Sequence, residues 1–207
     1  MSDRRTQIVG AGYDAMVDTW ESWKAQITND PRDEWCRELL TRLAPEARVV
    51  ELGSGGGTPE TVRLAERFRL TGVDLSAEQV RRARERVPEA EFVHADFTKV
   101  EFEPESIDAV AAFYSFNHVP RVLLPGLFAR IRGWLAPNGF LLTALGARDS
   151  PDWVGEWLGA TMFFSGWDPE TNRRLLAEAG FALLRDEVVT LTEPEGDGPF
   201  HWVLAQR

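Results

Sequence analysis

The chain has 207 residues, and its 33 acidic residues against 23 lysines and arginines give a net charge of −10. That length suits one α/β domain with a buried core and is short for two domains. A negative surface repels a phosphate backbone, so a nucleic acid partner is not expected. A single cysteine rules out an internal disulfide, and no apolar run nears the roughly 18 residues of a membrane span. These features predict a cytoplasmic monomer or homodimer without a membrane or nucleic acid partner.

The N-terminal segment is expected to contain two helices. Residues 1–12 are polar and contain two glycines, so they are expected to be mobile until something docks on them. Over residues 13–27, large apolar side chains recur at helical spacing on one face, at Met16, Trp20, Trp23 and Ile27. This helix either packs as plain core or forms a lid over a ligand. Asp30 and Pro31 predict the start of a second helix that runs to about residue 43.

A predicted strand over residues 48–52 runs into a glycine-rich turn at residues 53–57. Glycines there let the backbone approach a ligand closely. Thr58 suits a helix N-cap and Pro59 suits the first helical position, so a helix is predicted to start there with free N–H groups facing the turn. A turn of this kind after the first strand is where a doubly wound α/β sheet binds nucleotides.

The spacing of the glycines distinguishes between classes of nucleotide-binding site. The dinucleotide fingerprint requires glycine at position 58, which is Thr58, and a P-loop requires a lysine that does not follow these glycines. The chain instead has E-x-G-x-G-x-G, starting at Glu51. Asp74 ends the next predicted strand about 20 residues after Gly53, where a ribose-binding acid belongs in a βαβ unit.

The middle of the chain alternates strands with helices. Strands are predicted over residues 70–73, 92–93, 107–113 and 140–145, and helices over residues 58–68, 76–87 and 121–135. This alternation predicts a parallel sheet with right-handed crossovers. Ser76 and Gln79 form a capping-box pattern, and Phe92 and Val93 are predicted to be strand core. The arginines at 81, 82, 84 and 86 alternate with glutamates, which indicates a solvated helix face with local ion pairs.

In the last third, Ser150-Pro151 and Asp168-Pro169 predict the starts of two helices, the second ending at Gly180. Two strands over residues 181–191 and 200–206 are predicted to pair antiparallel because their connection is short. The chain is rich in large aromatic side chains, which form a small-molecule pocket, plain core or a dimer surface. They are Tyr13, Trp20, Trp23, Tyr114, Phe116, Trp153, Trp157, Phe163, Phe164 and Trp167.

Four blocks resemble, in order and spacing, the motifs of the class I S-adenosylmethionine-dependent methyltransferases. The blocks are residues 51–57, 72–76, 94–97 and 107–119. The resemblance implies an α/β fold: a Rossmann-like, doubly wound, mostly parallel seven-stranded sheet with an antiparallel C-terminal hairpin and helices on both faces. It implies one methyltransferase domain over residues 1–207. Its expected parts are an N-terminal lid or cap at 1–44, a cofactor-binding core at 45–145, and substrate-side helices with the hairpin at 146–207.

The resemblance implies S-adenosyl-L-methionine as the cofactor and S-adenosyl-L-homocysteine as its product. Asp74 would accept from both ribose hydroxyls and Asp96 from the adenine amine. The expected cofactor-binding residues are Glu51, Gly53, Ser54, Gly55, Gly57, Asp74, Leu75, Asp96, Phe97, Phe113 and Tyr13. The expected substrate residues are Tyr13, Trp20, Phe116, Asn117, His118, Trp157 and Phe163.

Methyl transfer from a sulfonium needs proximity, orientation and water exclusion more than acid catalysis. A hydroxyl or protonated amine acceptor also needs a base, and His118 is the candidate catalytic base. His94 and His201 are expected to be structural. No H-x-E-x-H or C-x-x-C spacing indicates a metal, although a carboxylate-bound magnesium stays open.

The expected function is methyl transfer to a small, apolar or aromatic metabolite. One alternative is a protein that binds the same cofactor without transferring the methyl group. Another is a nicotinamide-dependent oxidoreductase, which Thr58 disfavours. A macromolecular substrate is a weaker alternative.

Overall fold

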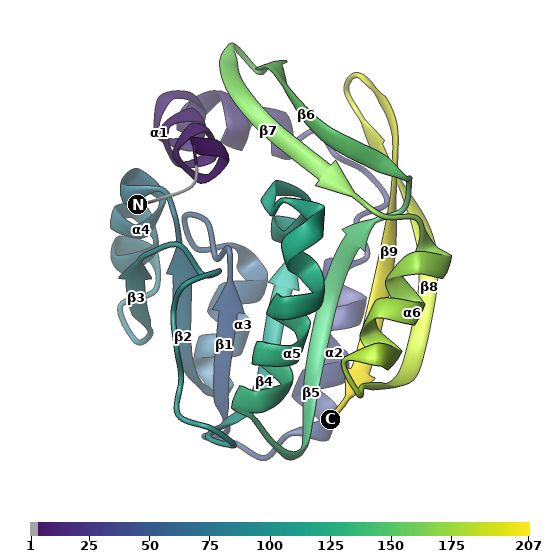
Figure 1. Cartoon of the computed structure of the whole chain (residues 1–207). Coiled ribbons are helices and arrows are strands. Elements are labelled where there is room, and N and C mark those ends of the chain that lie inside the picture. Colours follow the sequence, from purple (N-terminus) through teal and green to yellow (C-terminus); the bar gives the residue numbers. More distant parts are fainter. Residues whose placement is uncertain (1–3) are drawn as a thin grey trace.

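A seven-stranded sheet forms the centre of the computed structural model, which describes residues 4–207 (Figure 1). The strand order is β3-β2-β1-β4-β5-β9-β8, and a second sheet pairs β6 with β7. The strands are β1 (Arg48–Leu52), β2 (Arg69–Asp74), β3 (Glu91–His94), β4 (Ile107–Phe113), β5 (Leu135–Gly146), β6 (Ser150–Trp157), β7 (Ala160–Gly166), β8 (Ala182–Glu193) and β9 (Gly196–Gln206). The α-helices are α1 (Arg4–Lys24), α2 (Arg32–Arg42), α3 (Pro59–Arg67), α4 (Ala77–Arg86), α5 (Leu124–Trp134) and α6 (Pro169–Glu178). The 3₁₀ helices are η1 (Ser115–His118) and η2 (Arg121–Leu123).

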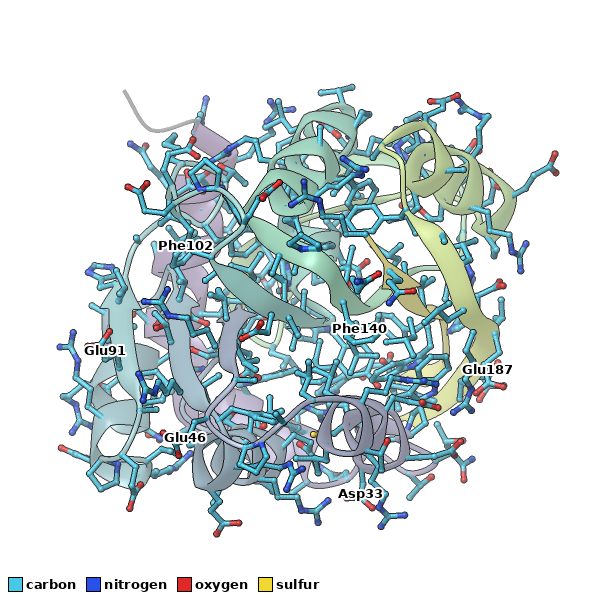
Figure 2. All side chains as sticks on the ribbon, turned by 90° about the horizontal axis from the view of Figure 1, so that it is seen from below. Asp33, Glu46, Glu91, Phe102, Phe140 and Glu187 are labelled. Atoms are coloured by element: carbon cyan, nitrogen blue, oxygen red, sulfur yellow. The ribbon has the colours of Figure 1, made fainter. Side chains whose placement is uncertain are left out.

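Helices cover both faces of the large sheet, because its strands carry apolar residues on both sides. One face packs on α5 and α6, where Phe128 and Leu176 are fully buried. The other face packs on α2 and α3, where Trp35 and Leu64 are fully buried. Figure 2 shows the sheet as a layer between these two pairs of helices. Strands β3, β2, β1, β4 and β5 are parallel, whereas β9 pairs antiparallel with β5 and β8, so the predicted fold is confirmed.

The sheet has a switch point between β1 and β4. From β1 the chain crosses over to β2 and β3 on one side, and from β4 it crosses over to β5 on the other. The loops that follow β1 and β4 therefore leave in opposite directions, and ligands of doubly wound sheets bind in the crevice between such loops. No helix in residues 4–207 has the length and apolarity that a bilayer span requires.

The N-terminal helix is longer than predicted. Residues 1–3 lie outside the described residues, but residues 4–12 are helical rather than mobile, and Ile27 lies beyond the helix end. The two glycines explain the difference, because they let α1 lie close to its neighbours. A Cβ at Gly12 would come within 2.9 Å of the Thr161 carbonyl oxygen, and one at Gly10 within 3.2 Å of Leu75. This close packing outweighs the low helix propensity of glycine.

The predicted helix after Ser150 is wrong, because residues 150–157 form strand β6. It pairs antiparallel with β7 through the two-residue connection Leu158-Gly159, whose φ angles are +50° and +80°. Two successive positive φ angles are the geometry of a tight hairpin turn. Ser150-Pro151 resembles a helix start in sequence, but the period of two at Trp153, Gly155 and Trp157 is the signal of a strand.

Two smaller expectations are also corrected. Phe92 is buried, but Val93 is 42% exposed, because β3 is an edge strand and residues 95–106 return to β4 without forming a helix over it. The final two strands extend beyond their predicted ends, so only Pro194 and Glu195 connect β8 to β9.

Candidate functional site

A cavity of about 330 Å³ lies at the carboxyl ends of β1, β2 and β4. Its remaining walls come from α1 and the β6–β7 hairpin, which lie above the sheet in Figure 1, and from strands β8 and β9 of the sheet. The predicted site residues that line it are Tyr13, Trp20, Gly53, Ser54, Gly55, Asp74, Leu75, Asp96, Phe97, Phe113, Asn117, His118 and Trp157. Four predicted residues are not in the lining: Glu51, Gly57, Phe116 and Phe163.

These four residues lie behind the cavity wall. Phe116 is buried in the core on the α5 side, and Phe163 is buried beneath α1. Gly57 faces α4, where a Cβ would come within 3.1 Å of Val87. Glu51 is only 1% exposed. They support the lining rather than contact the space inside it.

The glycine turn at residues 53–57 packs closely against the end of β2 and the loop that follows β4. The Gly53 N–H donates to the Val73 carbonyl at 2.7 Å, and the residue has φ +78°. A Cβ on Gly53 would come within 2.3 Å of the Ser115 Cβ, so only glycine fits. A Cβ on Gly55 would meet nothing within 4 Å, because that position faces open space. The turn therefore exposes backbone to the cavity.

The Asp74 carboxylate is fixed by two backbone donors. It accepts the Gly55 N–H at 2.8 Å and the Ser76 N–H at 2.9 Å. Burial raises its pKa, while these two hydrogen bonds oppose the shift. Because Ser76 donates its N–H to Asp74, only half of the predicted capping box forms, with the Ser76 hydroxyl accepting from the Gln79 N–H at 3.1 Å. Each Asp74 oxygen keeps a lone pair for a hydroxyl donor in the cavity.

Asp96 lines the cavity while it also closes a local turn. Its carboxylate accepts the Thr98 N–H at 3.0 Å and the Thr98 hydroxyl at 2.6 Å, and it pairs with Lys99 at 2.6 Å. The aromatic ring of Phe97 beside it also faces the cavity. The other two histidines bond elsewhere in the fold, His94 to the Leu75 carbonyl and His201 to Asp186.

His118 meets α1 across the cavity. Its Nδ1 lies 2.9 Å from the Phe163 carbonyl oxygen, which can only accept, so Nδ1 carries the hydrogen. Nε2 is then an acceptor, and the Tyr13 hydroxyl donates to it at 2.8 Å. Burial lowers the pKa of His118 to about 4 and raises that of Tyr13. Both side chains are therefore neutral near pH 7.

An acidic face of α1 holds this helix on α4. Asp14 accepts the Ser76 hydroxyl at 2.5 Å and the Glu78 N–H at 3.1 Å. Further along, Asp18 pairs with Arg82 at 2.6 Å, and Glu21 pairs with Arg86 at 2.6 Å. The predicted solvated face is therefore only partly correct. Arg81 does pair locally, with Glu78 and Glu85, but Arg82 and Arg86 also bind α1.

Part of the chain that forms this cavity matches known proteins. Residues 49–139 match the family model described as a methyltransferase domain. A trans-aconitate 2-methyltransferase of Paracidovorax citrulli is 42% identical over 120 residues, which are 54% of this chain and 44% of that protein. The chain thus spans less than half of the length of the first curated relatives that it matches.

Solved structures share the fold over the whole chain. Magnesium protoporphyrin IX methyltransferase of Synechocystis, solved with bound S-adenosylmethionine, matches with TM-score 0.74 and 15% identity, covering 100% of this chain and 98% of that one. The [4+2]-cyclase SpnF matches with TM-score 0.74 and 18% identity, covering 100% of this chain and 97% of that one.

Residues 49–139 thus match a methyltransferase domain, and the whole chain has the fold of the class I S-adenosylmethionine-dependent methyltransferases. The cavity can be tested for its fit to S-adenosylmethionine. The space before Gly55 is open. Asp74 offers acceptors beside that space. The buried Ser54 hydroxyl has no hydrogen-bond partner within residues 4–207, but it lies toward Gly72 of β2. The lining therefore offers a carboxylate acceptor where a ribosyl ligand needs one.

The site residues expected from the sequence did not include two cations that line the cavity. Arg32 pairs with Asp30 at 2.6 Å and lies over the Tyr114 ring. Lys24, the last residue of α1, lines the same cavity; its carbonyl oxygen accepts the Ile27 N–H at 3.2 Å. Nothing in the local sequence distinguishes these two from surface cations, because their place depends on how α1 and α2 meet the sheet.

Glu51 gives a prediction about stability. Burial raises the pKa of Glu51 to about 8, and its Oε2 has no partner within residues 4–207. The unfolded chain ionises near the ordinary glutamate pKa, so the folded state loses stability as the pH rises from about 4.5 to about 8. Glu51→Gln should therefore raise the free energy of unfolding at pH 8.5, by up to about 4 kcal/mol, and change it little at pH 4.

Thermal and urea unfolding at both pH values would check this expectation. The matched control is Glu46→Gln, since the Glu46 side chain is 71% exposed and the change should have little effect at either pH. If the wild-type protein is as stable as Glu51→Gln at pH 8.5, ionisation of Glu51 does not destabilise the folded state and the prediction is wrong.

Proposed function

We propose that the protein transfers a methyl group from S-adenosylmethionine to a small molecule. The observation that supports this most is the fixed Asp74 carboxylate beside the open space at Gly55. Relatives named for small-molecule substrates, including trans-aconitate, point the same way. The acidic net charge supports an enzyme that does not act on nucleic acid, and the single cysteine suits a cytoplasmic one. The enzyme would be a monomer or homodimer.

S-adenosylmethionine, when bound, supplies a methyl group on a sulfonium centre. Asp74 would accept the ribose hydroxyls with its remaining lone pairs. Asp96, Leu75 and Phe97 would hold the adenine, since all three line the cavity near the ends of β2 and β3. The remaining predicted contacts to the cofactor, at Gly53, Ser54, Gly55, Phe113 and Tyr13, line the same cavity.

The N-terminal segment at residues 1–44 would act as a lid. Tyr13 and Trp20 of α1 face the cavity, and Trp23 donates its indole N–H to Glu195 in the β8–β9 turn at 2.6 Å. This helix thus spans from α4 to the C-terminal hairpin. A seated lid would exclude water and raise the strength of electrostatic contacts inside.

The acceptor would lie among aromatic side chains opposite the glycine turn. Trp20, Trp157 and Phe164 form one wall, with ring centroids 5.6 Å apart for the two tryptophans and 5.3 Å apart for Trp157 and Phe164. Asn117 and Glu193 add polar groups. A mostly apolar pocket with a few polar groups suits a small apolar or aromatic acceptor.

His118 would be the base for a hydroxyl acceptor, acting through Tyr13. Because Tyr13 already donates to Nε2, the acceptor proton would pass to the Tyr13 oxygen as the Tyr13 proton passes to His118. His118→Asn and Tyr13→Phe should each lower kcat for a hydroxyl acceptor about 100-fold, and His118→Asn should leave S-adenosylhomocysteine affinity within about threefold. Since the pKa of His118 is about 4, wild-type kcat should stay level from about pH 6 to 8.

Steady-state kinetics with calorimetry of the same variants would check the base. His94→Asn is a matched control, because His94 also bonds a backbone carbonyl oxygen, that of Leu75 at 3.0 Å, but it does not line the cavity. Rates of His118→Asn equal to those of the wild type at every pH would make His118 structural.

A reaction other than methyl transfer on the same cofactor is the second candidate, favoured by the likeness to a cyclase fold. Incubation of the enzyme with S-adenosylmethionine and a panel of aromatic and carboxylic small molecules would separate the two. Methyl transfer predicts one S-adenosylhomocysteine for each acceptor that gains a methyl group. Conversion of a panel member without release of S-adenosylhomocysteine would favour the second candidate.

A further inference from the structure

Glu193 is a carboxylate in a largely apolar part of the cavity. It ends β8 and lines the cavity together with Leu191 and Phe200, which lie on the same face of the β8–β9 hairpin. The side chain is half-buried, yet it forms no ion pair or hydrogen bond with residues 4–207. Carboxylates in such settings are usually paired, so this one has the capacity to bind a ligand.

The Glu193 side chain leans along the hairpin toward the rest of the cavity lining. Glu193 pairs with Gly196 across the turn, but its carboxyl carbon lies 2.6 Å from the position that a Cβ on Gly198 would take. Gly198 is two residues nearer than Gly196 to Phe200, which lines the cavity. The absence of a side chain at Gly198 therefore gives the carboxylate its place on the face that borders the cavity.

The end of α1 packs on the hairpin turn at both sides of Glu193. Trp23 donates its indole N–H to Glu195, two residues after Glu193, at 2.6 Å. Thr28 pairs with Thr192, the residue before Glu193, through two backbone hydrogen bonds of 3.1 and 3.2 Å. The aromatic side chains at the end of α1 therefore lie at the same end of the cavity as this carboxylate.

Three tryptophan rings form the aromatic wall at this end. Trp20 stacks on Trp23 and Trp157 meets Trp23 edge to face, each with ring centroids 5.2 Å apart. Trp23 is buried, whereas Trp20 and Trp157 are only half-buried and line the cavity with part of their rings. Tryptophan rings attract cations more strongly than other aromatic side chains do. A carboxylate near such rings suits an ammonium group, whose charge it balances.

The charges near Glu193 do not supply such a cation. Burial and the neighbouring Glu195 raise the pKa of the Glu193 carboxyl, and Arg148 opposes this shift without forming an ion pair with Glu193. Of the two cations in the lining, Arg32 already has its ion-pair partner. The charges that act on Lys24 do not include Glu193. A cationic ligand would therefore relieve the repulsion between the two glutamates.

We infer that Glu193 binds a protonated amine of a small molecule, beside the rings of Trp20 and Trp157. The amine would donate to the carboxylate, and its carbon groups would contact the rings. The assignment of this amine to the methyl acceptor rests on the proposed function, because the aromatic wall is where the acceptor would lie. The inference narrows the acceptor to an amine on an apolar or aromatic body.

Calorimetric titration of the protein saturated with S-adenosylhomocysteine tests this with two probes of nearly equal shape. 2-Phenylethylamine is protonated near pH 7, and 2-phenylethanol is its neutral counterpart. Wild-type protein should bind the amine about tenfold more tightly than the alcohol, because a charge-assisted hydrogen bond is stronger than a neutral one. Glu193→Gln should remove this preference.

Two further variants separate the place of the carboxylate from its charge. Gly198→Ala should lower the preference about threefold, because the added methyl group displaces the Glu193 carboxyl while its charge remains. Asp197→Asn is the matched control. It removes one negative charge from the same turn, but Asp197 pairs with Thr192, so its side chain lies on the opposite face of the hairpin. This control should keep the wild-type preference.

The outcomes separate the amine site from the proposed function. Wild-type protein that binds S-adenosylhomocysteine but binds the amine no more tightly than the alcohol overturns the inference alone. A preference that persists in Glu193→Gln also overturns it, because another group then provides the charge. Protein that does not bind S-adenosylhomocysteine overturns the proposed function. The same titrations without that ligand then decide whether Glu193 binds an amine.

Discussion

Replacing Asp74 with alanine is expected to weaken binding of S-adenosylhomocysteine more than 100-fold while the protein stays folded. The Asp74 carboxylate holds the glycine turn through the Gly55 N–H and the start of α4 through the Ser76 N–H. Loss of a charged acceptor costs about 1.5–3 kcal/mol for each hydrogen bond, and two ribose hydroxyls would lose it. About 3 kcal/mol corresponds to roughly a 100-fold loss in affinity.

Calorimetry of Asp74→Ala would measure this loss, with circular dichroism to confirm the fold. Asp108→Ala is a matched control, because Asp108 also accepts a backbone N–H, that of Arg48 at 2.7 Å, but it lies at the opposite end of the sheet. It should lower stability without changing the affinity. If Asp74→Ala binds S-adenosylhomocysteine with unchanged affinity, Asp74 does not accept the ribose hydroxyls.

A leucine at Gly12 is expected to lower turnover about 100-fold by lifting the lid. A Cβ at this position would lie 2.9 Å from the Thr161 carbonyl oxygen, and that backbone atom cannot yield as the nearby Met162 side chain can. Helix α1 would move away from β7 and carry Tyr13 and Trp20 with it. Displacements of about 1 Å in positioning groups cost on the order of 100-fold in rate.

The neighbouring residue supplies the control for this variant. Ala11 is exposed on the same helix, so Ala11→Leu changes helix propensity and size without touching β7. Its turnover should equal that of the wild type. Binding of S-adenosylhomocysteine by Gly12→Leu should fall less than turnover does, because Asp74 and the glycine turn stay in place. Full activity of Gly12→Leu would show that α1 packs on the domain without acting as a lid.

The parts of the fold that sequence predicted best are those with strong local signals. The first strand has its predicted bounds, Arg48–Leu52, and Thr58 caps α3 by accepting the Thr61 N–H at 3.2 Å. The helix after Asp168 also starts as predicted, with the aspartate accepting the Thr171 N–H at 2.9 Å. Capping residues, proline and glycine act within a few residues, so a single sequence contains them.

The parts that sequence did not predict depend on contacts between distant segments. The β6–β7 hairpin begins with a helix-like Ser-Pro pair, whereas its structure as a hairpin depends on pairing with β7, which packs beneath α1. The contact between Tyr13 and His118 joins residues that are 105 positions apart. Lys24 acquires its place in the cavity only when α1 is seated. No local pattern encodes such pairings, because tertiary packing overrides local propensity.

The most direct test of the cofactor site is a calorimetric titration of the pure protein with S-adenosylhomocysteine, with NADH as the control ligand. We expect binding of one S-adenosylhomocysteine per chain with a micromolar dissociation constant, and no heat from NADH. No binding of S-adenosylhomocysteine would contradict the cofactor site built on Gly53, Gly55 and Asp74. Binding of NADH in its place would favour an oxidoreductase, despite Thr58.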